Sequence, residues 1–217
     1  MIGRSLFTLI LATSLFAEQE MITLPSPRIE STASLEHTIS MRRSLRDFSP
    51  ESLSIEQLSQ LLWAGQGITD GEELRAAPSA GALYPMELRV LVQRVKGLKP
   101  GLYVYKAEAH ALEAQRVPDA GYPLGDAAYG QDWMEEAPIV IFITATPSRT
   151  RVKYGERTER YLFLEAGHIG QNILLQAVAL GLGGTPVGAF DDDRIAKLLG
   201  TRQTPLYILP IGCPWKQ

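Results

Sequence analysis

Residues 159–190 read ERYLFLEAGHIGQNILLQAVALGLGGTPVGAF, a long amphipathic stretch that ends in a glycine-rich turn. Apolar side chains recur in it at spacings of three and four, which predicts a helix over 159–182 with a broad buried face. His168 is expected on the apolar side of this helix, as a core histidine. One glycine is enough to end a helix, so the surplus at Gly181, Gly183 and Gly184 favours a turn that also lies against a ligand.

Shorter elements are expected on both sides of this central helix. Ser54 and Gln57 form a capping box before a second helix, and Asp191 to Asp193 are interpreted as a helix cap and not as metal ligands. Pro210 indicates an edge or bulge position in the last strand. Helices and strands do not alternate regularly, so the predicted fold class is α+β. The expected shorter helices are 34–41, 55–66 and 191–199, the expected strands are 87–95, 138–145 and 206–212, and a hairpin is expected over 101–115.

The composition is that of an ordinary globular protein. The chain has 217 residues, 45% of them hydrophobic and 21% charged, and this length fits one domain. Its net charge is −3 and no run of Lys and Arg is longer than two, which argues against nucleic acid as a partner. Cys213 is the single cysteine, so neither an internal disulfide nor a thiolate-based zinc site is expected, and no metal site is predicted.

The first residues are typical of an export signal. Residues 1–17 have a positive start, an apolar stretch of about a dozen residues and a small residue, Ala17, at the end. The stretch is too short for a comfortable membrane span, so we expect a cleaved signal peptide, a periplasmic protein and no stable membrane insertion afterwards. An uncleaved anchor or a buried segment are the alternatives. Residues 18–33 are polar and contain prolines, which predicts a linker or arm before a domain at 34–217.

Two further motifs are candidates for ligand binding. Three arginines surround one serine in MRRSLRDF, residues 41–48, and guanidinium forks with a hydroxyl suit a phosphate group. A solvated basic turn is the alternative. Residues 77–85, APSAGALYP, are small enough for the backbone to approach a flat ligand, although a plain loop would have the same composition.

The order and spacing of these motifs resemble the nitroreductase superfamily of FMN-dependent oxidoreductases. Three further segments, KYGER at 153–157, ERY at 159–161 and EAGHIGQN at 165–172, narrow the resemblance. Together with PSAGALYP and GLYVY they are similar to the SagB/ThcOx branch, which includes the azoline dehydrogenases of peptide natural-product pathways. The resemblance extends from about Met41 to Gly212.

This resemblance implies a dimer with a mainly antiparallel central sheet flanked by helices, and an FMN at each subunit interface. It implies three groups of flavin-binding residues: a phosphate-binding group, a group that packs on the ring system from the same or the other subunit, and a group along the far edge of the ring. By that resemblance the groups are Arg42, Arg43, Ser44 and Arg46; Pro78, Ser79, Ala80 and Gly81; and Gly183 and Gly184. Lys216 stands where some relatives have a further phosphate-binding base.

Lys153 and Tyr154 match a Lys-Tyr pair that this branch uses for proton handling. A flavin accepts a hydride, and a nearby base must remove the accompanying proton. A surface lysine beside a packed tyrosine is the alternative. Gln131 and Trp133 would line the substrate side of the flavin, and simple packing is the alternative for Trp133.

The sequence therefore predicts a homodimeric FMN-dependent oxidoreductase. Hydride would pass from a donor through the flavin to an acceptor in ping-pong fashion, with a small or peptidic organic substrate. A non-catalytic flavin-binding or flavin-carrier protein in the cell envelope is the alternative, and a structural domain with an emptied pocket is a third possibility.

Overall fold

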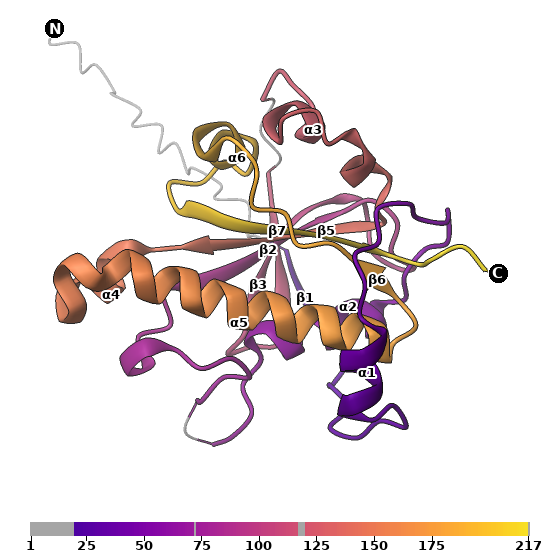
Figure 1. Cartoon of the computed structure of the whole chain (residues 1–217), viewed down its shortest axis with the longest axis horizontal. Coiled ribbons are helices and arrows are strands. Elements are labelled where there is room, and N and C mark those ends of the chain that lie inside the picture. The colour runs from indigo at the N-terminus through magenta and orange to yellow at the C-terminus, as the bar shows by residue number, and fades with distance from the viewer. Residues whose placement is uncertain (1–19, 72, 117–119, 217) are drawn as a thin grey trace, which may run out of the picture.

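The computed structural model describes residues 20–71, 73–116 and 120–216 (Figure 1). The predicted signal peptide, residues 1–17, lies outside this part of the chain. Among the described residues no helix has both the length and the apolar character needed to cross a membrane.

One seven-stranded sheet forms the centre of the molecule, and every pair of neighbouring strands in it is antiparallel. The prediction of an α+β fold with a mainly antiparallel sheet is confirmed. The strand order is β1-β4-β3-β2-β5-β7-β6. The strands are β1 (Met21–Thr23), β2 (Met86–Val92), β3 (Gly101–Lys106), β4 (Ala111–Gln115), β5 (Ile139–Ala145), β6 (Gly183–Gly184) and β7 (Thr204–Gly212).

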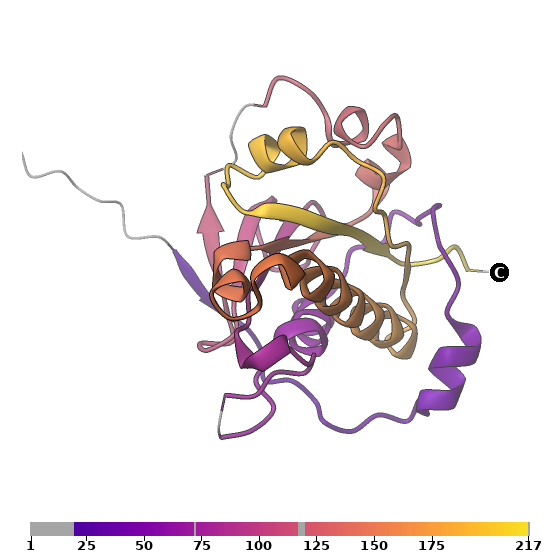
Figure 2. The same cartoon turned by 60° about the vertical axis from the view of Figure 1, so that its left-hand side comes forward.

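Helices cover both faces of this sheet (Figure 2). They are α1 (Leu35–Met41), α2 (Ile55–Gln66), α3 (Leu124–Ala127), α4 (Pro147–Tyr154), α5 (Thr158–Ala179) and α6 (Asp192–Leu198), with short 3₁₀ turns η1 (Ala80–Ala82), η2 (Asp132–Glu136) and η3 (Gly155–Arg157). The predicted caps are present. Ser54 Oγ accepts a hydrogen bond from the Gln57 amide at 3.2 Å, and Gln57 Oε1 accepts one from the Ser54 amide at 2.9 Å. Asp191 accepts from the Arg194 amide at the start of α6.

The core has two halves, one on each face of β5. All seven residues of β5 are buried, as its uninterrupted apolar sequence predicted. Its residues 139, 141 and 143 pack with α2 and α5, whereas residues 140 and 142 pack with α3 and α6. The sheet is thus sandwiched, and α5 is the central helix of one covering layer.

Two expectations about the ends of the sheet are corrected. Within the segment predicted as an arm, Met21–Thr23 forms strand β1 and pairs with β4. Strand β7 is not an edge strand, since it lies between β5 and β6, and its register shift lies opposite Ile143 and Thr144, away from Pro210. The carbonyl of Pro210, and with it the position of the missing N–H, faces β6. Because β6 has only two residues, the absent donor costs the sheet little.

Candidate functional site

The predicted site residues lie in two groups at opposite ends of α5. This helix has 22 residues and is therefore about 33 Å long. Figure 1 shows α4 at one end of α5, and α1 with β6 at the other. Lys153 and Tyr154 belong to α4, whereas the arginines at 42–46 follow α1. Within one chain the two predicted parts of the site do not share a pocket.

The arginine-rich segment lies directly against the glycine turn that follows α5. Ser44 forms a parallel bridge with Gly184, and the Leu45 amide donates to the Gly184 carbonyl at 3.2 Å. Thr185 Oγ1 donates to the Leu45 carbonyl at 2.6 Å. The structure therefore brings together two motifs that are about 140 residues apart in the sequence.

The arginines of this segment are available to an anion. Within the described ranges none of Arg42, Arg43 and Arg46 forms an ion pair with a carboxylate. Arg43 donates to the carbonyls of Ser40 and Arg42, and Arg46 lies 5.9 Å from the ring centroid of Trp133. Uncompensated guanidinium groups beside an exposed Ser44 hydroxyl suit a phosphate group.

The C-terminal tail runs along the same segment. The Ser49 amide donates to the Cys213 carbonyl at 2.9 Å, and Trp215 Nε1 donates to Asp47 Oδ1 at 2.7 Å. Lys216 pairs with Glu51 at 2.8 Å, which raises the pKa of the lysine and lowers that of the carboxyl. Both side chains are exposed, and an ion pair in water contributes little. Lys216 therefore lies close to the arginine segment but has a partner of its own.

Gln131 and Trp133 lie at the same end of α5 as the arginine segment. Gln131 Nε2 donates to the carbonyl of Ala189, in the glycine-rich stretch after α5, and also to that of Ala128. The ring of Trp133 lies 6.4 Å from that of Phe48. These contacts attach the segment around η2 to both neighbouring motifs.

Packing alone accounts for the two glycines of β6. A Cβ on Gly184 would lie 2.6 Å from the carbonyl oxygen of Pro210, and a Cβ on Gly183 would lie 2.8 Å from Leu45 Cδ2. The sequence argument that surplus glycines favour a ligand is therefore weakened, because the close approach of β7 and Leu45 already requires them.

A Gly184→Ala variant tests this account. We expect it to lower the free energy of unfolding by about 1–3 kcal/mol, because the added methyl meets backbone atoms that cannot move aside easily. Urea denaturation measures the change. Gly167→Ala is the control, since that helical position is open and alanine is favoured there by up to about 1 kcal/mol. Equal stabilities of Gly184→Ala and the wild type would contradict the packing account and would leave ligand binding as the explanation for this glycine.

At the other end, the small-residue loop contacts the predicted catalytic pair. Gly81 has a φ of +64°, and a Cβ there would lie 2.8 Å from Lys153 Nζ and 3.0 Å from Tyr154 Oη. Lys153 is exposed, and its Nζ lies 5.6 Å from the ring centroid of Tyr154, which packs on Tyr161. The positive φ favours glycine at this position, and the short distances show that the motif PSAG and the pair Lys153-Tyr154 lie on one surface.

The backbone of this loop is strained and is tied down at Tyr84. Ala82 and Tyr84 have φ values of +53° and +43°, conformations that cost energy for residues with a side chain. The Tyr84 amide donates to Ser79 Oγ at 3.0 Å, and Arg149 donates to the Tyr84 carbonyl at 2.9 Å. The guanidinium of Arg75 lies 4.7 Å from the Tyr84 ring centroid.

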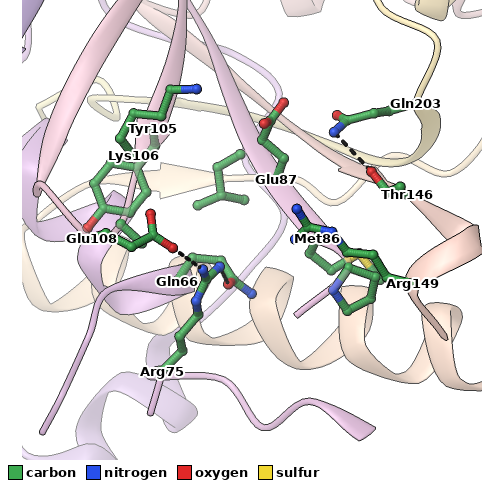
Figure 3. A pocket seen from close by; sticks show the side chains of 13 residues that line it. Gln66, Arg75, Met86, Glu87, Tyr105, Lys106, Glu108, Thr146, Arg149 and Gln203 are labelled. Carbon is green, nitrogen blue, oxygen red and sulfur yellow. Dashed lines mark hydrogen bonds and ion pairs between the residues drawn. The ribbon is translucent and has the colours of Figure 1, made fainter. Parts of the chain in front are cut away.

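A cavity of about 210 Å³ lies beside these ties (Figure 3). Arg75 and Arg149 both line it, and Arg75 donates to Gln66 Oε1 at 2.8 Å and to Glu108 Oε1 at 2.7 Å. Glu87 and Lys106 also line the cavity and pair with Arg89 and Glu113 outside it. The charged side chains of the lining therefore already have partners.

Glu165 is a site residue for which the sequence analysis assigned no role. It is 3% exposed, and its Oε2 accepts the hydroxyl proton of Ser79 at 2.7 Å, whereas Oε1 has no partner among the described residues. Burial raises the pKa of Glu165 to about 7, against the opposing effects of Ser79, Arg75 and the Ala80 amide. The signal was present in the periodicity, because Glu165 falls between Leu162 and Ile169 on the buried stripe of α5.

His168, by contrast, is exposed, so the expectation that it lies on the apolar side of α5 is wrong. It lies on the outer face with Phe163 and Leu164, which are 61% and 53% exposed. The outer face of α5 therefore carries two large apolar side chains beside polar ones, and nothing in the described part of the chain covers them.

Glu165 makes stability depend on pH. Its folded pKa lies above the ordinary value of 4.5, so the unfolded state releases this proton first and stability falls as the pH rises from about 4.5 to 7. The expected loss is on the order of 3 kcal/mol. Glu165→Gln cannot titrate. In urea denaturation, the free energy of unfolding of the variant minus that of the wild type should therefore increase as the pH rises from about 4.5 to 7. A constant difference between the two proteins would contradict the assignment.

A sandwiched antiparallel sheet, a long central helix and two motif-bearing ends define an α+β protein of the nitroreductase-like class. The nitroreductase family model matches residues 39–213, and the chain belongs to that family. Its members are oxidoreductases, generally flavin-dependent and typically dimeric.

Individual relatives agree with this membership. "Putative nitroreductase MJ1384" of Methanocaldococcus jannaschii is 40% identical over 178 residues, which are 82% of this chain and 90% of the relative. A nitroreductase-fold crystal structure from Ralstonia eutropha JMP134 has a TM-score of 0.77 at 27% identity and covers 91% of this chain and 90% of its own. A chain of the E. coli microcin synthetase McbBCD complex has a TM-score of 0.68 at 24% identity, with 98% and 85% covered, and shows the same fold.

Proposed function

We propose that the protein is an FMN-dependent dehydrogenase or reductase of the SagB type, acting on a small or peptidic organic substrate by a ping-pong mechanism. The observation that carries the proposal is that two chemically different groups of side chains lie at the two ends of α5. One end offers guanidinium groups without carboxylate partners in the described ranges, and the other offers a lysine and a tyrosine against a glycine loop.

The residues present fit FMN. Arg42, Arg43, Ser44 and Arg46 would hold the phosphate, with Lys216 available once its exposed ion pair opens. Gly183 and Gly184 lie beside them and would border the ring. Pro78 and Gly81 are exposed at the tip of the small-residue loop, Ser79 and Ala80 are half-buried beside them, and this tip would cover the ring face.

A homodimer reconciles these two ends. FMN is shorter than α5, so one flavin does not reach both groups of residues within one chain. A twofold axis that places two α5 helices antiparallel would bring the arginine segment of one protomer to the loop of its partner. The exposed apolar residues on α5 and α1 support this contact; they are Phe163, Leu164, Leu35, Ile39 and Met41.

Proton handling would fall to Lys153 and Tyr154. When bound, FMN supplies hydride acceptance and donation. The Lys153 amine would take a proton from the substrate, and the Tyr154 hydroxyl, 3.0 Å from the Gly81 Cβ position, would orient the transferring group. Gln131 and Trp133 would line the substrate side. Export to the periplasm, inferred from residues 1–17, is part of the proposal.

The visible absorption spectrum of the purified mature protein tests the proposal, with the released chromophore identified by its mass. We expect a flavin spectrum, the mass of FMN, and bleaching when a substrate or reductant donates hydride. A flavin that no donor or substrate reduces would favour the carrier alternative. A colourless protein that does not take up added FMN would contradict both readings.

A further inference from the structure

The loop 79–84 rests on a buried acid whose second oxygen accepts no hydrogen bond of normal geometry. Ser79 Oγ stands between Glu165 and the backbone of the loop, since it donates to Glu165 Oε2 at 2.7 Å and accepts from the Tyr84 amide at 3.0 Å. Glu165 Oε1 is buried and no hydrogen bond of normal geometry reaches it, although the Ala80 amide of the same loop lies near enough to favour the ionised carboxylate. An ionised carboxylate held in this way lacks part of the solvation that water would give it.

The loop above this acid has a reason to open. Its backbone has positive φ at Gly81, Ala82 and Tyr84. This conformation is energetically unfavourable for Ala82 and Tyr84, which have side chains, so opening of the loop would relieve strain. Gly81 and Ala82 are exposed, so opening would not uncover a core side chain at the tip. Movement of Ser79 would admit water to Glu165.

We propose that Glu165 is a positioning residue of the proposed flavin site: closure of residues 79–84 buries it beside Ser79, its neutral form tolerates this burial, and its ionisation favours the open loop. The inference rests on the proposed function in one respect, namely that the loop covers a flavin ring. The proton linkage itself is a property of the chain alone.

The direction follows from solvation. In the closed loop burial holds the pKa of Glu165 near 7, and access of water in the open loop would return it toward its ordinary value. The conformation with the higher pKa is favoured at low pH, so the loop is most firmly closed below about pH 4.5. Opening becomes progressively easier up to about pH 7 and changes little above it.

The surrounding charges do not replace Glu165 in this role. Arg75, from the segment after α2, is the charged side chain that favours the ionised form electrostatically. Lys153 and Tyr154 of α4 contact the loop at Gly81. On α5 itself, Tyr161 and His168 lie one turn to either side, and His168 is exposed.

Hydrogen exchange of the peptide covering residues 79–84 tests the linkage in the protein without added ligand. After correction for intrinsic exchange, we expect wild-type protection to fall between about pH 6 and about pH 8.5. The equilibrium constant for opening rises about tenfold over this range when the pKa of Glu165 is about 7 in the closed loop and near 4.5 in the open loop, and protection falls by the same factor while the closed loop predominates. Glu165→Gln should stay protected at both pH values. Ser79→Ala should be poorly protected at both, because the bond that transmits the effect is missing.

Glu159→Gln is the matched control, an exposed glutamate on the same helix, and should behave as the wild type. Infrared difference spectra between the two pH values should show a protonated-carboxyl band at low pH that Glu165→Gln lacks. Wild-type protection that does not change with pH, or that changes equally in Glu165→Gln, would overturn the proposal.

Flavin binding separates this inference from the proposed function. Opening also weakens FMN binding, so the Kd for FMN of the wild type, divided by that of Glu165→Gln, should rise over the same pH range. The factor of this rise and the factor by which protection falls should multiply to about ten. Titration of the FMN phosphate is common to both proteins and cancels. Failure of every variant to bind FMN would contradict the proposed function while the exchange data still judge the loop. A constant ratio of Kd values, together with protection that falls by much less than tenfold, would overturn the role of Glu165 in the flavin site.

Discussion

A protein carrying Arg42→Ala and Ser44→Ala together is expected to fold normally and to bind FMN at least about 100-fold more weakly than the wild type. Hydrogen bonds to charged groups contribute about 1.5–3 kcal/mol each, so loss of two phosphate contacts costs about 3–6 kcal/mol. Neither side chain forms a hydrogen bond or ion pair with a residue in the described ranges, so the fold does not depend on them. Fluorescence titration with FMN measures the loss, and circular dichroism reports the fold.

The control is a variant with the same two substitutions away from the arginine segment. Arg202→Ala with Ser148→Ala removes one guanidinium and one hydroxyl at exposed positions, and should bind FMN as the wild type does. Full flavin occupancy in the Arg42, Ser44 double variant would remove the phosphate assignment and leave this segment as a solvated basic turn.

Lys153→Ala is expected to retain flavin and to slow dehydrogenation by about 10²–10⁴-fold, the range that a positioned general base contributes. The side chain is exposed, so its removal should leave stability almost unchanged. The rate constant of flavin reduction in single-turnover experiments measures the effect. In the variant, the pH profile of this rate constant should lose the part in which the rate depends on deprotonation of the base.

Arg151→Ala, on the same helix and also exposed, is the charge-matched control and should not alter the rate. Lys153→Met keeps most of the volume without the amine and should be as slow as Lys153→Ala. Unchanged turnover in either Lys153 variant would assign this lysine to the surface and would leave Tyr154 to be tested alone.

Elements whose signal is local were predicted well. The capping box of Ser54 and Gln57, the doubly buried strand β5 and the periodicity of α5 each depend on residues within one or two turns or one strand. Their neighbours in the sequence are also their neighbours in the structure, so the amino-acid pattern is sufficient.

Features that depend on distant partners were missed or misjudged. Strand β1 exists because β4 offers it an edge, and Pro210 is tolerated in β7 because β6 is short. The bounds of α5 agree with the prediction, but the predicted buried face does not agree at every position. His168, expected on the apolar side, is exposed, and Glu165, for which no role was predicted, is buried. Which side of a helix is buried depends on what packs against it, and the exposed Phe163 and Leu164 on the outer face of α5 blur the apolar pattern that would identify the buried side.

The pattern of helices and strands in the sequence predicted the fold class, and its motifs pointed to the family; both are confirmed. The phosphate-binding role of the arginine-serine segment and the proton-transfer role of the lysine-tyrosine pair stay predictions. Tertiary structure decided where these residues lie: the arginines against Gly184, the Lys-Tyr pair against Gly81, and α5 between them. It also decided that Ser79 meets a buried Glu165 across 86 positions of sequence. The physical reason is that residue types carry their chemistry with them, whereas distance, burial and solvation arise only when the chain has packed.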